Sequence, residues 1–411
     1  MQVFQWFTRH SHSLAAGNNT DKEHHWSDSE EPVDECGPTG YHPTAIGDVF
    51  DSKYRVIRKV GWGGSSTVWL VRNQIDGSIA ALKLLTGFAS STPLLHELEY
   101  LQRMRDEDPE HPGYPHVIRL IDHFYHEGVY DRHLGLVTEA LGQDLASLME
   151  RFKGGRIPLC AVKRITRQVA LALDYLHNSC HIIHTDVKPA NVLCVVKDVS
   201  RFRPPPEPFH VSAHETPDGR VITRFASHPV RYALPHDLNA PDAWNDFEVK
   251  LADVGVACWG DKIDDHFTKL IQSPALRAPE VCIVAGWGKP ADVWALGCMV
   301  YELATGHSLL PRDVQEDHVP YLHAVLFDEY PMALLERGRF SHVFYEDNGK
   351  LNVPSSTRYY LKDRLRDQLS GSNLDRSSVD ELYDFLKLML EVDPEKRASL
   401  EEILAHRWLS T

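Results

Sequence analysis

The residues best suited to chemistry lie together in one short stretch, His184-Thr185-Asp186-Val187-Lys188-Pro189-Ala190-Asn191. An acid, a lysine and an amide in this order suit the transfer of a phosphoryl group. That reaction asks little covalent chemistry of a protein, which must hold a hydroxyl in line and neutralise charge. We expect Asp186 to accept the hydroxyl proton, Lys188 to stabilise the transferring group, and Asn191 to bind a metal ion through its amide oxygen.

A second acid, Asp253, follows in the segment Leu251-Ala252-Asp253-Val254-Gly255. Carboxylate and amide oxygens are ligands that Mg²⁺ accepts, with phosphate oxygens and water completing its shell. We therefore expect Asp253 to hold, with Asn191, the metal that bridges the β- and γ-phosphates of ATP. An accidental loop of the same residue types is the alternative, and the order of the other motifs argues against it.

A glycine-rich turn, Gly61-Trp62-Gly63-Gly64-Ser65-Ser66-Thr67-Val68, lies between two predicted strands. Glycine lacks a Cβ, so the backbone N–H groups of such a turn can approach phosphate oxygens closely. A simple β-hairpin turn would explain the same residues, but Lys83 on the following predicted strand favours a nucleotide. The residues predicted to surround ATP in this region are Gly61, Trp62, Gly63, Gly64, Ser65, Ser66, Val68, Ala81 and Lys83.

The elements that must position these residues follow from the hydrophobic pattern. Runs rich in β-branched and aromatic residues predict strands at Tyr54–Val60, Ser66–Val71, Ser78–Leu84, Val117–Phe124 and His133–Thr138. Leucines at helical spacing predict a helix over Pro93–Arg105. A longer amphipathic helix is predicted from Pro158 to Cys180, and it delivers the chain to His184.

Glu97 lies beside the leucine stripe of the helix predicted at Pro93–Arg105. It is either a solvated surface acid or the partner of Lys83, whose ammonium it would hold against the α- and β-phosphates. Glu99 is close by, so the register of the helix decides between the two acids.

The bulk composition is that of a globular protein and narrows the class of partner. The chain has 411 residues, of which 43% are hydrophobic, and a formal net charge of −15. That charge disfavours nonspecific binding to nucleic acid or to anionic membrane and favours basic partners. Seven cysteines without a C-x-x-C pair indicate a reducing compartment. No apolar run reaches the roughly eighteen residues of a membrane span, so none is expected.

Two segments lack a regular pattern. Residues 1–43 are polar with an acidic middle and predict a disordered tail. A mitochondrial transit peptide at Met1–Leu14 is an alternative, which the scarcity of arginine disfavours. A proline-rich segment at about 197–247 has little helical periodicity and is predicted to be a surface insertion, disordered in part. It would be either a tolerated loop or a site for a partner.

Taken together, the motifs resemble the signature set of eukaryotic protein kinases. From Tyr54 to Leu409 the chain is similar, more specifically, to the SR-protein kinases, the SRPK-like branch of the CMGC group. The segments that carry this resemblance are Gly40-Tyr41-His42-Pro43, Ile46-Gly47-Asp48, Ser66-Thr67-Val68-Trp69, His184-Thr185-Asp186, Ala257-Cys258-Trp259, Pro290-Ala291-Asp292 and Glu302-Leu303-Ala304-Thr305-Gly306.

The resemblance implies further roles. The strand end at Thr138, Glu139 and Leu141 would be a hinge between two lobes and would bind adenine, although it could also be no more than a strand end. Glu280 would be buried against Arg397 and would lock the loop that binds the substrate peptide. Asp292 would be tied to backbone amides near the catalytic stretch.

Several residues depart from the family's pattern. Ser66 stands where the third glycine of the turn is usual, and Val254 where most kinases carry phenylalanine, which leaves the metal-binding acid in place. Thr185 replaces an arginine that normally pairs with a phosphate on the activation loop, so activity is expected without loop phosphorylation.

The positions that would recognise substrate also differ. SR-protein kinases hold Arg-Ser repeats through an acidic groove. Asp317 keeps one of these acids, whereas His307 and Ala324 stand where acids are expected. Processive phosphorylation of Arg-Ser domains is therefore not implied, although a basic substrate still suits the net charge.

The sequence thus predicts an α+β, two-lobed protein kinase fold, with a small, mostly β N-lobe at 44–141 and a larger, mostly α C-lobe at 142–411. The predicted reaction is transfer of the γ-phosphate of ATP, with Mg²⁺, to serine or threonine in basic proteins, among which Arg-Ser-rich proteins are candidates. We expect a monomer in the cytoplasm, the nucleus or both, without direct contact to nucleic acid or membrane.

Two other functions were weighed against this one. A pseudokinase scaffold would bind partners through the tail and insertion, but the residues expected for catalysis are all present at Lys83, Glu97, Asp186, Lys188, Asn191 and Asp253. A small-molecule phosphotransferase would share the early motifs but not Glu280, Asp292 and Arg397.

Overall fold

The structure is a computed structural model. It describes residues 30–32, 35–198, 202, 211–215, 219, 221–238, 240–262, 268–352, 358–372 and 374–410. The chain forms two compact units. The first unit comprises Met1–Arg105, Ile118–Gln143 and Val195–Tyr232, and the second comprises Asp106–Val117, Asp144–Cys194 and Ala233–Thr411. Each is described by itself.

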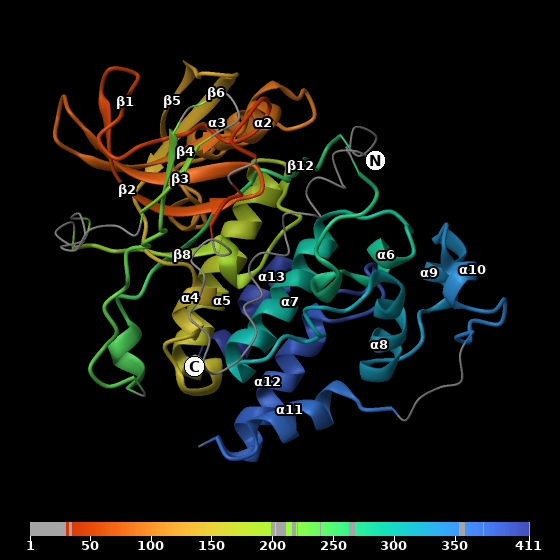
Figure 1. Cartoon of the computed structure of the whole chain (residues 1–411). Helices are drawn as coiled ribbons and strands as arrows, with labels where there is room; N and C mark the ends of the chain where they lie inside the picture. The colour runs from red at the N-terminus through yellow and green to blue at the C-terminus, as the bar shows by residue number, and fades with distance from the viewer. Residues whose placement is uncertain are drawn as a thin grey trace. The chain divides into compact units, whose positions relative to one another are not determined.

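The first unit is built on an antiparallel sheet of six strands in the order β1-β2-β3-β4-β6-β5 (Figure 1). The strands are β1 (Val49–Phe50), β2 (Tyr54–Gly63), β3 (Ser66–Asn73), β4 (Ile79–Leu85), β5 (Leu120–Glu127) and β6 (Arg132–Glu139). Many of their β-branched and aromatic residues pack in one core, in which Trp69, Leu82 and Val137 are almost fully buried.

Two helices accompany the sheet, α2 (Gly87–Ser91) and α3 (Glu97–Asp106). The sequence predicted that the second of these would begin at Pro93, and this start was wrong. Pro93 and Leu94 form a turn, and the side chain of Leu94 is 44% exposed. Although the leucines have helical spacing, Leu94 does not pack as part of a buried helix face. The helix begins instead at Glu97, where an acidic side chain suits the positive end of the helix dipole.

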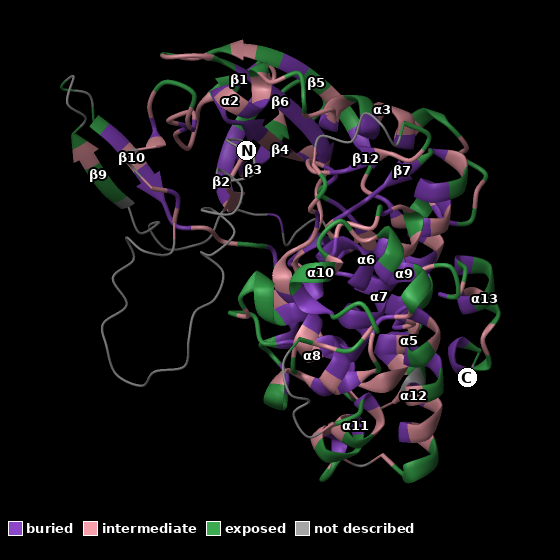
Figure 2. Cartoon of the chain, turned by 90° about the vertical axis from the view of Figure 1, so that its right-hand side faces the viewer, coloured by how far each residue is buried: buried purple, intermediate pink, exposed green. Residues whose placement is uncertain are grey.

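The proline-rich segment is folded where the structure describes it. Residues Val211–Glu215 (β9) and Val221–Phe225 (β10) form an antiparallel hairpin, on which Figure 2 shows buried positions along β10. Phe225 packs edge-on against Trp69, with ring centroids 6.0 Å apart. Residues up to Tyr232 therefore group with the first unit, and not with the C-lobe to which the sequence assigned the whole insertion.

The end of the tail also differs from the predicted disorder. From Glu30 to Pro43 the described residues pack on the first unit, and Cys36 and Tyr41 are buried in a small cluster with Ile222. Hydrophobic and aromatic residues in this otherwise polar stretch supply the burial that a disordered segment lacks. Residues 1–29, including the candidate transit peptide, lie outside the described residues.

The second unit is mostly helical. Its α-helices are α4 (Leu145–Met149), α5 (Leu159–Asp174), α6 (Pro279–Cys282), α7 (Lys289–Thr305), α8 (Val319–Leu326), α9 (Met332–Arg337), α10 (Ser341–Phe344), α11 (Leu361–Leu369), α12 (Arg376–Met389) and α13 (Leu400–Ala405). Figure 2 shows α7 buried along almost its whole length. None of the helices in the described ranges is long and apolar enough to cross a membrane.

Helix α7 ends where the backbone requires a glycine. Gly306 has a φ of +76°, and a Cβ there would lie 1.8 Å from the carbonyl oxygen of Gly154. A left-handed glycine at this position is a common way to end a helix. The contact joins the end of α7 to the turn that precedes α5.

Helix α5 carries the chain toward the catalytic stretch, as the amphipathic pattern predicted. Val162, Ile165, Val169 and Leu173 are buried along one face. The α-helix ends at Asp174 and continues as a π-helical turn, Tyr175–Ser179, into strand β7 (Ile182–Ile183). Two short ladders follow, β8 (Val192–Cys194) with β11 (Val249–Leu251), and β7 with β12 (Cys258–Trp259).

Candidate active site

In the first unit, Lys83 and Glu97 form an ion pair. Lys83 Nζ lies 2.5 Å from Glu97 Oε1, and the Glu97 side chain is only 7% exposed. Lys83 is held in the middle of β4, opposite Val68 of β3 and Leu136 of β6. Glu99, which was the alternative, is 57% exposed and lies 3.8 Å from His96. The start of α3 at Glu97 turns this acid, and not its neighbour, toward the lysine.

The glycine-rich turn joins β2 to β3. Gly63 pairs with Ser66, so Gly64 and Ser65 make the turn itself, while Trp62 pairs with Thr67 and Gly61 with Val68. Around Gly61 and Gly63 no atom of the described residues lies within 4 Å of where a Cβ would be. The Cβ positions of these two glycines are therefore uncrowded. Ser66 is buried and is the first residue of β3, where it closes the turn by pairing with Gly63.

The predicted hinge residues lie on the same sheet. Ala81 pairs with Thr138, and Ala80 pairs with Glu139. Thr138 is buried, and its Oγ1 donates to the carbonyl oxygen of Glu139 at 3.3 Å. Strand β6 ends at Glu139, and Leu141 follows in the connection, half-buried. Ala81, Lys83 and Thr138 thus belong to one pair of adjacent strands.

In the second unit, Asp186 has two close polar neighbours from its own loop. Lys188 Nζ lies 2.6 Å from Asp186 Oδ2. Asn191 Nδ2 donates to the same oxygen at 2.9 Å and to the Asp186 carbonyl at 2.8 Å. These bonds fix the direction of the Asp186 carboxylate.

Burial disfavours the charged form of Lys188, but the carboxylates of Asp186 and Asp253 outweigh it and raise the pKa of the ammonium group. Lys188 therefore remains a cation at neutral pH, in the field of both acids. The sequence separates these acids by more than sixty residues, and the fold brings both within electrostatic reach of one lysine.

The backbone of the stretch from His184 to Asn191 is held by Asp292, which is fully buried in α7. Its carboxylate accepts from His184 N at 2.7 Å and from Thr185 N at 2.8 Å, and His177 Nε2 lies 2.8 Å from it. Thr185 has a φ of +67°, a conformation that a β-branched residue adopts at a cost. The two bonds to Asp292 hold it there.

Asp253 is exposed and also has a left-handed backbone, with a φ of +62°. The β8–β11 ladder places its segment beside Asn191, and Ala252 N donates to the Asn191 carbonyl at 2.9 Å. Thr185 Oγ1 donates to the carbonyl of Val256 at 2.7 Å. The two predicted metal-binding residues are therefore held at the ends of paired strands.

These residues fit Mg²⁺ better than a metal enclosed by protein. Asn191 contacts Asp186 through its amide nitrogen, so this contact does not use the amide oxygen. Across the described ranges no group of three or more His, Cys, Asp or Glu side chains could hold a metal. Mg²⁺ commonly takes one or two protein oxygens and completes its shell with phosphate and water.

The predicted pair Glu280–Arg397 is present and buried. Arg397 Nη1 and Nη2 lie 2.7 Å and 2.9 Å from the two carboxylate oxygens of Glu280, which is the bidentate arrangement. Arg397 also donates to the carbonyl of Pro290 at 2.7 Å. The pair thus joins α6, the start of α7 and the segment before α13.

The sequence reading missed residues that hold the segment before Ala278. Gln272 has a φ of +64°, and its side chain donates to the carbonyl of Ala291 and accepts from Ala278 N. Arg277 donates to the carbonyls of Ile271 and Gln272. Arg277 also donates to the carboxylate of Glu316 at 3.2 Å. Neither residue belongs to a periodic pattern, because their partners are backbone groups of a loop and an acid that is distant in the sequence.

The three positions expected to recognise substrate differ in their exposure to solvent. Asp317 is exposed on the turn Glu316–His318, and His307 is exposed just after α7. Ala324 is buried in α8, where its carbonyl accepts from Arg358 at 2.6 Å. An acid at Ala324 would therefore need a cationic partner inside the protein.

Known proteins resemble this chain over most of its length. The family model for the protein kinase domain matches residues 54–203 and 240–409. The chain is 32% identical to "Serine/threonine-protein kinase SRPK" of Physarum polycephalum, over 93% of this chain and 92% of that one. It is 30% identical to "Protein kinase dsk1" of Schizosaccharomyces pombe, over 92% of this chain and 85% of that one. With "SRSF protein kinase 3" of Mus musculus the identity is 28%, over 93% and 91%.

Proposed function

Because the chain belongs to the protein kinase family and, within it, to the SRPK serine/threonine kinases, we propose that it phosphorylates serines in basic proteins and that Mg²⁺ accompanies its ATP. ATP use and a protein substrate follow from the family. The identity of the metal, the kind of protein substrate and the roles of individual residues belong to the proposal.

The observation that carries the proposal is the set of contacts at Asp186. Its carboxylate accepts from Lys188 and Asn191, so it points in a fixed direction. We assign to it the role of accepting the proton of the substrate hydroxyl. Lys188, which remains a cation, would stabilise the charge that develops on the transferring group. Asn191 and Asp253 would hold Mg²⁺, which supplies charge neutralisation on the phosphates when bound.

We assign the nucleotide to the first unit's glycine-rich turn and the strands beside it. The uncrowded Cβ positions of Gly61 and Gly63 leave their backbone accessible to phosphate oxygens. Lys83, oriented by Glu97, would contact the α- and β-phosphates. Thr138, Glu139 and Leu141 would border the adenine, with Ala81 on the neighbouring strand.

The proposal of a basic substrate depends on charge. The net charge of −15 attracts cationic proteins and speeds their encounter. Asp317 is 74% exposed, and its Oδ1 lies 2.8 Å from Nδ1 of His318. We propose that it also meets a cationic residue of the substrate. Arg-Ser repeats are one such substrate, although His307 and Ala324 provide no acid where the family is expected to have one. We further propose that the chain acts as a monomer in the cytoplasm or nucleus, without direct contact to nucleic acid.

Transfer from labelled ATP·Mg²⁺ to an Arg-Ser repeat peptide and to a generic basic protein tests the proposal, with Asp186→Asn as the inactive variant. A carboxylate acting as base contributes on the order of 10²–10⁴ in rate, so the variant should lose that much while still binding ATP. Exposed Asp347→Asn removes the same charge elsewhere and should leave the rate unchanged.

The outcomes separate the alternatives. Transfer to the Arg-Ser peptide would support the basic-substrate proposal in its narrow form. Transfer only to the generic protein would support the proposal of basic substrates and would exclude Arg-Ser repeats as a substrate. Binding of ATP without transfer to either would favour a scaffold that binds partners through the tail and insertion.

A further inference from the structure

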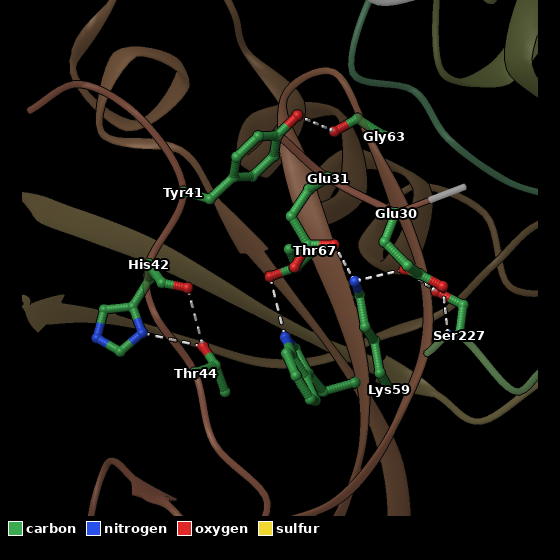
Figure 3. Close-up of polar contacts among 10 residues, drawn as sticks. Glu30, Glu31, Tyr41, His42, Thr44, Lys59, Gly63, Thr67 and Ser227 are labelled. Atoms are coloured by element: carbon green, nitrogen blue, oxygen red, sulfur yellow. Dashed lines mark hydrogen bonds and ion pairs between the residues drawn. The ribbon is translucent and has the colours of Figure 1, made fainter. Parts of the chain in front are cut away.

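The end of the tail lies against the glycine-rich turn (Figure 3). Tyr41 Oη donates to the carbonyl oxygen of Gly63 at 3.0 Å. The Tyr41 ring is 2% exposed and meets Trp62 edge-on, with centroids 6.3 Å apart. A rigid aromatic side chain thus reaches the turn from a segment twenty-two residues earlier in the chain.

A second contact reaches the same strand just before the turn. Lys59 of β2 is fully buried, and its Nζ binds Glu30 Oε2 at 2.7 Å and Glu31 Oε2. A buried ammonium needs such partners, because removing them leaves an uncompensated charge in a low-dielectric interior. The tail is therefore tied to β2 by a charge cluster as well as by Tyr41.

The insertion completes this arrangement. Glu30 accepts from Ser227 N at 2.6 Å and from Ser227 Oγ at 2.9 Å. His228 N donates to the carbonyl of Lys59 at 3.0 Å. Glu30 thus links the tail to the insertion at Ser227, which lies 197 residues later in the sequence. Both the tail and the insertion bind Lys59.

These contacts fall beside an irregularity of the sheet. The β2–β3 ladder shifts register between Lys59 and Gly61. A shifted ladder leaves backbone groups out of regular pairing and lets the strand bend. Glycines at Gly61 and Gly63 add conformational freedom and no side-chain packing. The β2–β3 ladder alone therefore leaves the turn free to move, and contacts from other segments, such as Tyr41, limit that movement.

We propose that Tyr41 and Lys59 are positioning residues for ATP, and that the tail from Glu30 and the insertion around Ser227 together brace the glycine-rich turn. The inference rests on the proposed assignment of this turn to the nucleotide. These contacts reduce the conformational entropy that the turn loses when it closes on phosphate, so they strengthen the binding of the nucleotide. They leave the substrate peptide and Asp186 untouched.

Tyr41→Phe isolates this effect, because it removes only the hydroxyl that binds Gly63 and keeps the ring against Trp62. One hydrogen bond corresponds to a loss of about threefold to tenfold, so the KM for ATP should rise by that factor while kcat stays within about twofold. The KM for a peptide substrate should not change. Hydrogen exchange should become faster at residues 61–66.

Tyr54→Phe is the matched control. Tyr54 is buried at the other end of β2, and its hydroxyl donates to Asp122 at 2.8 Å. The control removes a tyrosine hydroxyl bond of at least equal strength, because its acceptor is a carboxylate, and it does not touch the turn. ATP affinity should be unaffected. If both variants weakened ATP equally, the effect would be a general loosening of the sheet and the inference would be overturned.

A second variant tests the charge cluster in the full chain. Replacing Glu30 and Glu31 by glutamine keeps their shape but removes the negative charges that balance Lys59. The KM for ATP should rise at least as much as in Tyr41→Phe, and far-ultraviolet circular dichroism should show that the fold persists. Unchanged ATP affinity in this folded variant would contradict the role of Lys59.

Titration of the wild type with Mg·ATP keeps the two proposals apart. No binding by the wild type would remove the assignment of the nucleotide itself. If the wild type binds Mg·ATP and Tyr41→Phe binds it with the same affinity, only the proposed role of the tail and insertion in holding the turn would be rejected.

Discussion

At the residue scale, the site depends on charges that hold one another. Lys83 is held by Glu97, and Lys188 by Asp186, each through one short ion pair. Each pair fixes the direction of a cation to which we assign a role in phosphoryl transfer. Because the two charges of each pair are in contact, neutralising the acid should leave the lysine less well oriented.

Glu97→Gln should raise the KM for ATP and lower kcat/KM about tenfold to a hundredfold, because the bond to a charged lysine is worth roughly 1.5–3 kcal/mol. Glu99→Gln changes a neighbouring acid that is 57% exposed, and it should leave both constants unchanged. Steady-state kinetics with varied ATP measures the difference. Equal effects of the two substitutions would show that the pair with Lys83 is not the cause.

Thr185 predicts independence from loop phosphorylation. It has no cationic group to bind a phosphate, and its hydroxyl instead binds the carbonyl of Val256. Treatment with a phosphatase should therefore leave activity within about twofold of its starting value, because no phosphate–arginine contact is available to lose. Phosphate content by mass spectrometry confirms that treatment worked. Loss of activity in parallel with loss of phosphate would refute this prediction.

At the element scale, some features followed from the sequence and others could not. The α+β fold and the long helix before His184 were predicted, because periodicity reports which face of an element is buried. The start of α3 was misplaced because Leu94 and Leu95 imitate a helical stripe. The packing of Glu30 on Lys59 was missed, since it joins residues that no local pattern relates. Only the tertiary fold shows that this polar stretch has a buried lysine to bind.

The Glu280–Arg397 pair predicts a large effect on stability. Arg397→Met leaves the Glu280 carboxylate buried without its partner, and the free energy of unfolding should fall by about 3–5 kcal/mol. Chemical denaturation measures this value. The double variant Glu280→Leu, Arg397→Met removes both charges and should recover part of the loss.

Arg337→Met is the control for that experiment. Arg337 forms an ion pair with Glu395 at 2.9 Å, but the two side chains are 45% and 73% exposed. Exposed pairs contribute about 0–1 kcal/mol, so the loss should stay in that range. A cost as large as that of Arg397→Met would show that burial is not what makes the Glu280 pair important.

At the scale of the whole molecule, each unit contains a histidine kept neutral by its surroundings. Burial, followed by the neighbouring His133 and His126, lowers the pKa of His42 in the first unit to about 3. Burial, followed by Arg397, lowers the pKa of His323 in the second unit to about 3. His323 is fully buried, and its Nδ1 lies 2.6 Å from Tyr330 Oη.

The second unit should therefore lose stability as the pH falls below about 6.5, the ordinary pKa of histidine in an unfolded chain. Between this pH and about 3 the unfolded state binds a proton that folded His323 does not. The contribution is fully present above pH 6.5 and amounts to a loss of about 1.4 kcal/mol by pH 5.5. Urea denaturation at pH 7.5 and 5.5 measures it.

His323→Gln should flatten this dependence by the same amount, which urea denaturation of the variant at the same two pH values measures. An unchanged slope in the His323 variant would mean that other groups cause the acid sensitivity.

The pairing of β8 with β11 has a consequence for how the length of the chain can vary. Cys194 pairs with Val249, so residues 195–248 form an excursion whose two ends are held side by side in the second unit. Closing a longer excursion costs only about 0.6 kcal/mol for each doubling of its length. Residues can be added there while Asn191 and Asp253 keep their spacing, provided that the stretch around Ser227 still reaches Glu30. The fold thereby separates the part of the chain that can lengthen from the part that the reaction constrains.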